Sequence, residues 1–189
     1  MIKFVSLRGR TIVRTWQSIL IILICFFVFA GTSQAKDILQ FDFPNGGWHK
    51  VESPDGVKSK KCYVPVNQTA SDYREMLIFS ERIIKHEGIN AMVMLQKQLG
   101  KDFNNYRDIA PQYILKNENN AMVTWCSSLK NVCSVERIFK GNEGIVSAIY
   151  INKMPHYSQN MFGQWPNILA KVEVWNKQDK TANNLIELD

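Results

Sequence analysis

Four strand-like runs separated by short polar turns occupy residues 112–153. They read QYILK, AMVTWCS, VCSVERIFK and GIVSAIYINK, with the turns NENN, SLKN and GNEG between them. Because strands joined by tight turns run in opposite directions, this pattern predicts an antiparallel meander. A sheet of this kind must bury at least one face, so the rest of the chain has to cover it.

Two amphipathic segments are the predicted cover. The first begins at Asn90, a helix N-cap, and its apolar face carries Met92, Leu95, Leu99, Phe103 and Tyr106. The second begins at Ser158 and contains Pro166, which predicts a kink or the first turn of a new helix. Its buried stripe comprises Met161, Phe162, Trp165, Ile168, Leu169 and Val172. The expected fold class is therefore α+β, a single domain in which an antiparallel sheet of about six to seven strands packs against two helices.

Four more strand-like segments are expected before the first helix. Residues 38–43 and 48–52 flank an Asn-Gly pair, which predicts a hairpin between them. KSKKCYVPV reads as the next strand, and residues 70–84 read as a single turn followed by a strand rich in strand-forming residues from Met76 to Ile84. The polar residues 176–189 are expected to form a frayed tail, which leaves 36–175 as the domain.

The first 35 residues have the layout of a signal peptide. Four basic residues precede an apolar run at 19–30, and Ser33-Gln34-Ala35 offers small residues for cleavage after Ala35. The competing interpretation is a retained anchor, but 12 apolar residues fall short of the roughly 20 that a spanning helix needs. We therefore expect a periplasmic or secreted protein without a stable membrane span after cleavage.

Removal of the signal peptide changes the charge balance. The 23 basic residues fall to 19, against 17 acidic residues, so the pI near 9.1 gives no support for nucleic-acid binding. Only Lys58, Lys60 and Lys61 form a locally basic stretch. It is interpreted as a solvated sheet edge, with an anionic ligand site as the alternative.

Cys126 and Cys133 flank the SLKN turn. A turn centred on Leu129 and Lys130 places the two cysteines directly opposite each other on neighbouring strands, which predicts a disulfide. A structural zinc site would need more ligands nearby, and a redox centre would favour Cys-x-x-Cys. We expect no metal and no cofactor.

Cys62 is left without an obvious partner. It is interpreted as a buried free thiol, with a mixed disulfide to Cys126 or Cys133, intermolecular pairing or a reactive nucleophile as alternatives. A nucleophile would need His49, His86 or His156 close by as its base. Met154, His156 and Met161 are soft donors that suit Cu(I), although two sulfurs and one imidazole without a repeat are a weak pattern. No catalytic residue is assigned.

The order of segments also resembles a known group. FPNGGWHKVESP, KCYVPVNQTASDYREMLIF, a helix, the cysteine hairpin and GNEGIVSAIYINK follow one another. This order resembles small exported proteins of unknown function from Gram-negative bacteria and is similar to PsbP/Mog1-like α+β domains. The resemblance covers residues 38–172 and implies the fold class, without an active site to transfer.

Three functions are compatible with the sequence. The leading hypothesis is a non-enzymatic periplasmic binding or accessory component of a cell-envelope or secretion assembly, with an envelope protein as partner and with Trp48, Met154, His156 and Tyr157 as contacts. It predicts an exposed apolar patch or an uncovered edge strand. The alternatives are a thiol-dependent or hydrolytic enzyme using Cys62 or a serine with a histidine base, and a small-ligand carrier with an apolar cavity of about 300 Å³ or more.

Overall fold

A computed structural model of the chain describes residues 37–44, 46–83, 90–105, 110–142, 144–153, 159–175 and 184–188. All of them belong to one compact unit, Ala35–Asp189. The predicted signal peptide lies outside the described residues, so its cleavage remains a prediction. Neither helix in the described part of the chain combines the length and the apolar character that a membrane span requires.

Seven antiparallel strands form the main sheet, in the order β2-β3-β4-β8-β7-β6-β5. Their bounds are β2 Trp48–Val51, β3 Lys60–Pro65, β4 Glu75–Ile83, β5 Gln112–Lys116, β6 Asn120–Ser127, β7 Val132–Lys140 and β8 Gly144–Lys153. The expected meander of the last four strands and the expected strand after residue 71 are both confirmed.

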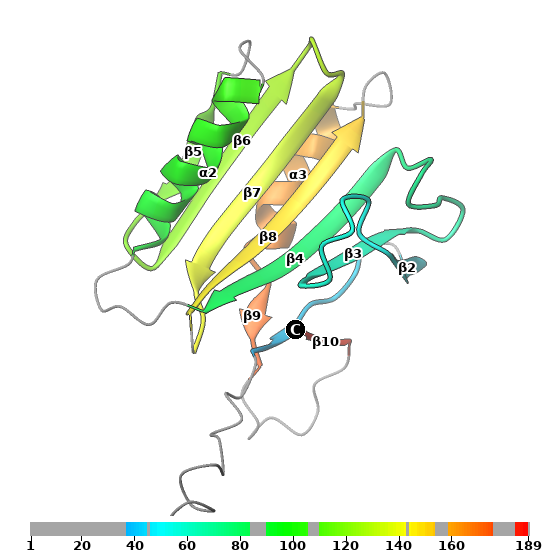
Figure 1. The fold of residues 1–189 in the computed structure, drawn as a ribbon, viewed down its shortest axis with the longest axis horizontal. Helices are drawn as coiled ribbons and strands as arrows, with labels where there is room; N and C mark the ends of the chain where they lie inside the picture. The colour runs from blue at the N-terminus through cyan, green and yellow to red at the C-terminus, as the bar shows by residue number, and fades with distance from the viewer. Residues whose placement is uncertain are drawn as a thin grey trace, which may run out of the picture. The chain divides into compact units, whose positions relative to one another are not determined.

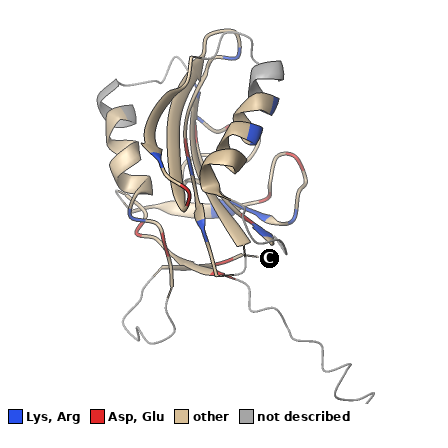
Figure 2. Ribbon diagram, turned by 90° about the vertical axis from the view of Figure 1, so that its left-hand side faces the viewer, with Lys and Arg blue, Asp and Glu red and all other residues tan. Residues whose placement is uncertain are grey.

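The two helices cover opposite faces of this sheet, which Figure 2 shows edge-on between them. Helix α2 (Ala91–Asn105) contacts β6 and β7, and helix α3 (Gln159–Leu169) contacts β7 and β8 from the other side (Figure 1). The expected α+β fold, in which an antiparallel sheet packs against two helices, is confirmed. Because alternate residues of a strand point to opposite faces, the central strands bury side chains on both sides, as β7 does from Cys133 to Phe139.

Helix α2 begins as its sequence predicts. The Oδ1 atom of Asn90 accepts a hydrogen bond from the backbone N–H of Val93 at 2.8 Å, which is the geometry of an N-cap. Leu95 and Leu99 are buried against Val123 and Ile138 of the sheet. Gly100 lies within the helix without ending it.

Helix α3 packs with Trp165 and Leu169 against the opposite face, where Val172 is buried just after the helix ends. Pro166 lies inside this helix. The side chains of Met161 and Phe162 lie outside the described residues, as does Ser158.

A second sheet of three strands supplies the rest of this core. Strand β1 (Ile38–Gln40) lies between β10 (Leu185–Glu187) and β9 (Glu173–Val174) and is antiparallel to both. Leu39, Phe41, Ile186 and Leu188 are buried in the same cluster as Trp165.

Two expectations were therefore wrong. Residues 38–43 do not form a hairpin with 48–52, because β1 pairs with β10 and β9 while β2 pairs with β3. Gly46 and Gly47 both have positive φ, and the carbonyl of Gly47 accepts a hydrogen bond from Val66 instead. Burial of Leu39 and Phe41 outweighed the local turn preference. Residues 184–188 of the expected tail are not frayed either, since β10 pairs with β1 and Ile186 and Leu188 are buried.

The expected disulfide is present. Cys126 and Cys133 are directly opposed in the β6–β7 register, with Cα atoms 4.0 Å apart, and their sulfurs are bonded. The N–H of Asn131 donates to the carbonyl of Ser128 across the turn, and Asn131 has a φ of 52°. A stable disulfide fits an oxidising compartment outside the cytosol.

We expect the double variant Cys126→Ala/Cys133→Ala to lose about 2.5 kcal/mol of unfolding free energy, because the bond restricts a short loop in the unfolded chain. Urea unfolding with and without dithiothreitol measures it. The reductant should lower the midpoint of the wild type and leave the variant unchanged. Equal midpoints for wild type and variant without reductant would show that the turn and ladder alone hold this hairpin.

Candidate functional site

One end of the α3-covered sheet face collects aromatic and polar side chains from distant segments. Trp48 on β2 pairs in register with Pro65 on β3, and Glu75 on β4 pairs with Asn152 on β8. Asn152 is in turn opposite Cys133. Because directly opposed residues of an antiparallel sheet share a face, this row runs across the sheet toward the disulfide.

A hollow of about 250 Å³ opens where this row meets α3 and the connection before β2. Its described lining residues are Pro44, Gly46, Gly47, Trp48, Pro65, Glu75, Gln164, Trp165 and Ile168. Glu75 carries the one charged side chain among them. We call this hollow the tryptophan pocket.

The indole rings of Trp48 and Trp165 form two walls of the tryptophan pocket. Their centroids are 5.9 Å apart and the ring planes meet at 78°. Trp165 stacks on Tyr150 at a centroid distance of 3.7 Å, and it is only 3% exposed. The Nε1 atom of Trp48 donates to the carbonyl of Pro44 at 3.1 Å, so this indole offers its ring rather than its donor. Tyr150 therefore fixes the wall formed by Trp165, and the Pro44 carbonyl fixes the wall formed by Trp48.

Glu75 has an environment that disfavours its charged form. Partial burial raises the pKa of this carboxyl above its ordinary value of 4.5, and a hydrogen bond with Tyr150 opposes that shift. Burial also raises the pKa of Tyr150, whose hydroxyl accepts a hydrogen bond from Nδ2 of Asn152 at 3.1 Å. The carboxyl group of Glu75 is thus held in place, although no cationic side chain lines the described part of the tryptophan pocket.

We expect Glu75→Gln to stabilise the protein at pH 7 and to have little effect near pH 4. A raised pKa means that the folded state binds the proton more tightly, so the contribution of Glu75 to stability is present below pH 4.5 and is lost as the pH rises through its folded pKa. Urea midpoints of both proteins across this range measure the difference. A constant difference at all pH values would assign the effect to packing.

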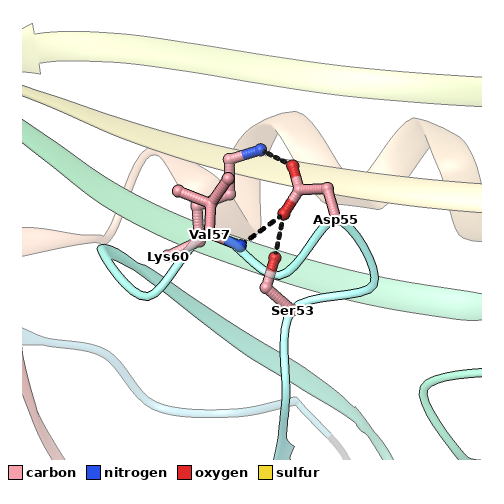
Figure 3. Close-up of polar contacts among 4 residues, drawn as sticks. All are labelled: Ser53, Asp55, Val57 and Lys60. Carbon is pink, nitrogen blue, oxygen red and sulfur yellow. Dashed lines mark hydrogen bonds and ion pairs between the residues drawn. The ribbon is translucent and has the colours of Figure 1, made fainter.

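A second hollow, of about 590 Å³, lies beside the connection between β2 and β3. Lysines line it together with Glu52, namely Lys50, Lys58, Lys60 and Lys61. In the connection, Asp55 accepts hydrogen bonds from Ser53 and from the N–H of Val57 and forms an ion pair with Lys60 (Figure 3). These hydrogen bonds, above all that of Lys60, lower the pKa of Asp55 to about 2. Part of the positive charge is therefore already neutralised.

The lysine-rich stretch was expected to form a solvated sheet edge, and this is true only in part. Strand β3 lies between β2 and β4, but β2 pairs only with Cys62–Pro65, so Lys60 and Lys61 pair with β4 alone. Lys58 is exposed, whereas Lys61 is only 7% exposed.

Cys62 is a buried free thiol, as its leading interpretation predicted. It has no exposed surface and packs with Val64 and Met76. Burial raises the pKa of the Cys62 thiol above 9.0, and a hydrogen bond with Ser53 opposes that shift. Because the thiolate is the nucleophile, this environment disfavours reactivity.

We expect Cys62 in the folded protein to react with iodoacetamide at pH 8 at least about tenfold more slowly than free cysteine, because burial limits both access and thiolate content. Mass spectrometry of timed, quenched samples measures the rate. Full reactivity should return in urea. Rapid alkylation of the folded protein would restore the reactive-thiol hypothesis.

The remaining candidate residues are only partly placed. His49 lies on β2 opposite Val64, and its Nδ1 atom is buried without a hydrogen-bond partner in the described structure. His86, Met154, His156 and Tyr157 lie outside the described residues, so the histidine base and three of the four expected partner contacts remain predictions. No group of three or more His, Cys, Asp or Glu suitable for a metal forms within the described ranges.

Sequence reasoning selected Trp48 but missed Glu75 and Gln164 as site residues. It assigned Trp165 only to a buried helical stripe. Glu75 lies at the start of a predicted strand, where a carboxylate carries no distinguishing pattern. No local pattern connects these residues, because Trp48 and Trp165 are 117 positions apart in the chain.

Among known proteins, this chain has a structural match but no match in sequence. No protein-family model matches the chain, and no curated protein matches its sequence. Its structure is similar to the solution structure of the cyanobacterial PsbP protein (CyanoP) from Synechocystis sp. PCC 6803, with a TM-score of 0.48 and 7% identity. The match covers 77% of this chain and 96% of that one.

Proposed function

We propose that this chain is an exported, non-enzymatic protein of the cell envelope that binds a partner protein at the tryptophan pocket. The observation that carries the proposal is the hollow itself, in which Trp48, Trp165 and Glu75 converge from three separate elements. A partly buried carboxylate beside an open hollow costs folding free energy, and a ligand that binds in the hollow can offset this cost.

Export is supported by the signal-like N-terminus and by the disulfide between Cys126 and Cys133, which suits an oxidising compartment. The enzymatic alternative is weakened by the burial and raised pKa of Cys62. The carrier alternative is also less favoured. The tryptophan pocket is smaller than about 300 Å³, the lower range for small-molecule sites, and the larger hollow carries four lysines beside Val51 and Val57.

Strand addition at the free edge of β5 is not the favoured docking mode. The β5–β6 register shifts between Tyr113 and Leu115, which marks a bulge, and a lysine ends the strand. Bulges and lysines discourage pairing with another strand. We therefore favour the tryptophan pocket over the β5 edge as the docking site for a partner protein.

Site-specific photo-crosslinking in intact cells tests the proposal. A photoreactive amino acid replaces Gln164, which is exposed at the tryptophan pocket, or Gln96, which is exposed on α2 across the sheet. We expect a discrete adduct with an envelope protein at Gln164 only. Equal adducts at both positions, none at Gln164, or recovery of the chain in the cytosolic fraction would contradict the proposal.

A further inference from the structure

The tryptophan pocket has the dimensions of a site for one side chain. Its volume of about 250 Å³ lies below the range of about 300–1,000 Å³ typical of pockets that enclose a small-molecule ligand. A single long side chain or a small organic ion fits such a volume better than a cofactor. The occupant is therefore a small group, either part of a partner or a free ion.

The indole ring of Trp48 favours a cation in that space. An aromatic face attracts an ammonium or guanidinium group within about 6 Å of its centroid, and tryptophan does so best. Trp48 and Trp165 meet edge to face, and Trp165 is almost fully buried under Tyr150, so Trp48 supplies the indole surface that is open to a ligand. A positive group in the hollow can lie against this ring.

The charge of the tryptophan pocket points to the same ligand. Glu75 is the one charged residue among its described lining residues, and partial burial raises the pKa of its carboxyl. A cation bound beside that carboxylate would compensate the charge and replace the water lost on burial. Tyr150 engages Glu75 by a hydrogen bond, but a carboxylate has about four acceptor positions and retains capacity for a ligand.

We propose that the tryptophan pocket binds a single organic cation, an ammonium or guanidinium group held between the ring of Trp48 and the carboxylate of Glu75. The inference rests on the proposed function, and it names the chemistry of the group that the partner inserts. The same chemistry is offered by a lysine or arginine side chain of a partner and by a free small ammonium ion.

Titrations of the purified protein test this assignment. The probes are Nα-acetyl-lysine amide, Nα-acetyl-arginine amide, choline and the uncharged Nα-acetyl-norleucine amide, and the readout is the shift of tryptophan indole N–H signals by NMR. We expect the three cations to shift these signals saturably and the norleucine amide to leave them unchanged. Tighter binding of the amino-acid amides assigns the source to a partner's side chain, and tighter binding of choline assigns it to a free ammonium ion.

Glu75→Gln supplies the decisive comparison, because it keeps the shape of the side chain and removes its charge. We expect it to weaken binding of the cations by at least about tenfold, the equivalent of one charge-assisted hydrogen bond. Trp48→Leu should weaken binding too, while Glu118→Gln, at an exposed turn, should not. Equal binding of norleucine amide, or unchanged cation binding by Glu75→Gln, would overturn the assignment.

The outcome also separates this inference from the proposed function. Crosslinks at Gln164 in cells together with no response to any cation would keep the binding function and overturn the ligand class. Saturable cation binding together with no crosslink at Gln164 would support the site chemistry and overturn the envelope-partner function.

Discussion

Replacing Arg137 with methionine should lower the free energy of unfolding by about 4 kcal/mol, because it removes charge-assisted hydrogen bonds to three carbonyl groups at once, two of them in buried contacts. Arg137 lies on β7 and is 7% exposed. Its Nη1 atom donates to the carbonyl oxygens of Leu169 at 2.7 Å, Ala170 at 3.1 Å and Val172 at 2.7 Å. Leu169 is the last residue of helix α3, and Ala170 and Val172 follow it closely, so this guanidinium acts as the C-terminal cap of the helix.

Further contacts fix the same side chain. Nε of Arg137 donates to Oδ1 of Asn120 at 3.0 Å, and the guanidinium lies 4.3 Å from the ring centroid of Phe139. Arg137→Lys should recover only part of the loss, because an ammonium group lacks the planar fork that reaches several acceptors. Urea unfolding measures both variants.

The matched control is Arg74→Met, since Arg74 is exposed. It should change stability by less than about 0.5 kcal/mol, which is usual for a surface substitution. A loss below about 1 kcal/mol for Arg137→Met would mean that water replaces the guanidinium at the helix end, and the capping role would then be wrong.

Replacing Trp165 with alanine should cost about 4 kcal/mol, within the range for removing a large aromatic side chain from a core. Trp165 joins α3 to the sheet through Tyr150 and forms one wall of the tryptophan pocket through its contact with Trp48. Trp165→Phe keeps an aromatic ring over Tyr150 and should cost about 1–2 kcal/mol.

Far-UV circular dichroism during urea unfolding measures these changes without relying on tryptophan fluorescence. Leu129→Ala is the control, because Leu129 is 71% exposed in the β6–β7 turn, and it should change stability by less than about 0.5 kcal/mol. If Trp165→Ala cost no more than Leu129→Ala, α3 would not be held to the sheet by this ring.

The predictions that the structure confirmed depend on neighbouring residues. The SLKN turn fixes which residues of β6 and β7 face each other, so the pairing of Cys126 with Cys133 followed from counting outward from the turn. Asn90 as the cap of α2 and the apolar step of Leu95 and Leu99 are likewise local patterns. Hydrophobic periodicity and turn preferences depend on a few neighbouring residues, so they can be recognised from the sequence without knowledge of the fold.

The first strand shows where local patterns fail. The Asn-Gly pair after residues 38–43 favoured a hairpin, yet β1 pairs with β10, some 145 positions away. Asp37, which directly precedes β1, also makes a contact distant in sequence. Its buried carboxylate accepts hydrogen bonds from the N–H of Asn142 at 2.9 Å and 3.2 Å. A turn contributes little energy compared with burying Leu39 and Phe41 in the core.

The sequence by itself determined the α+β class, the meander, both helices and the disulfide, since each arises from hydrophobic periodicity or from a turn that brings near neighbours together. Only the tertiary structure decided that Trp48, Glu75 and Trp165 share one hollow and that Arg137 caps α3. These groups meet because non-adjacent strands pair and a helix packs across them, and such contacts leave no repeating trace in the order of residues.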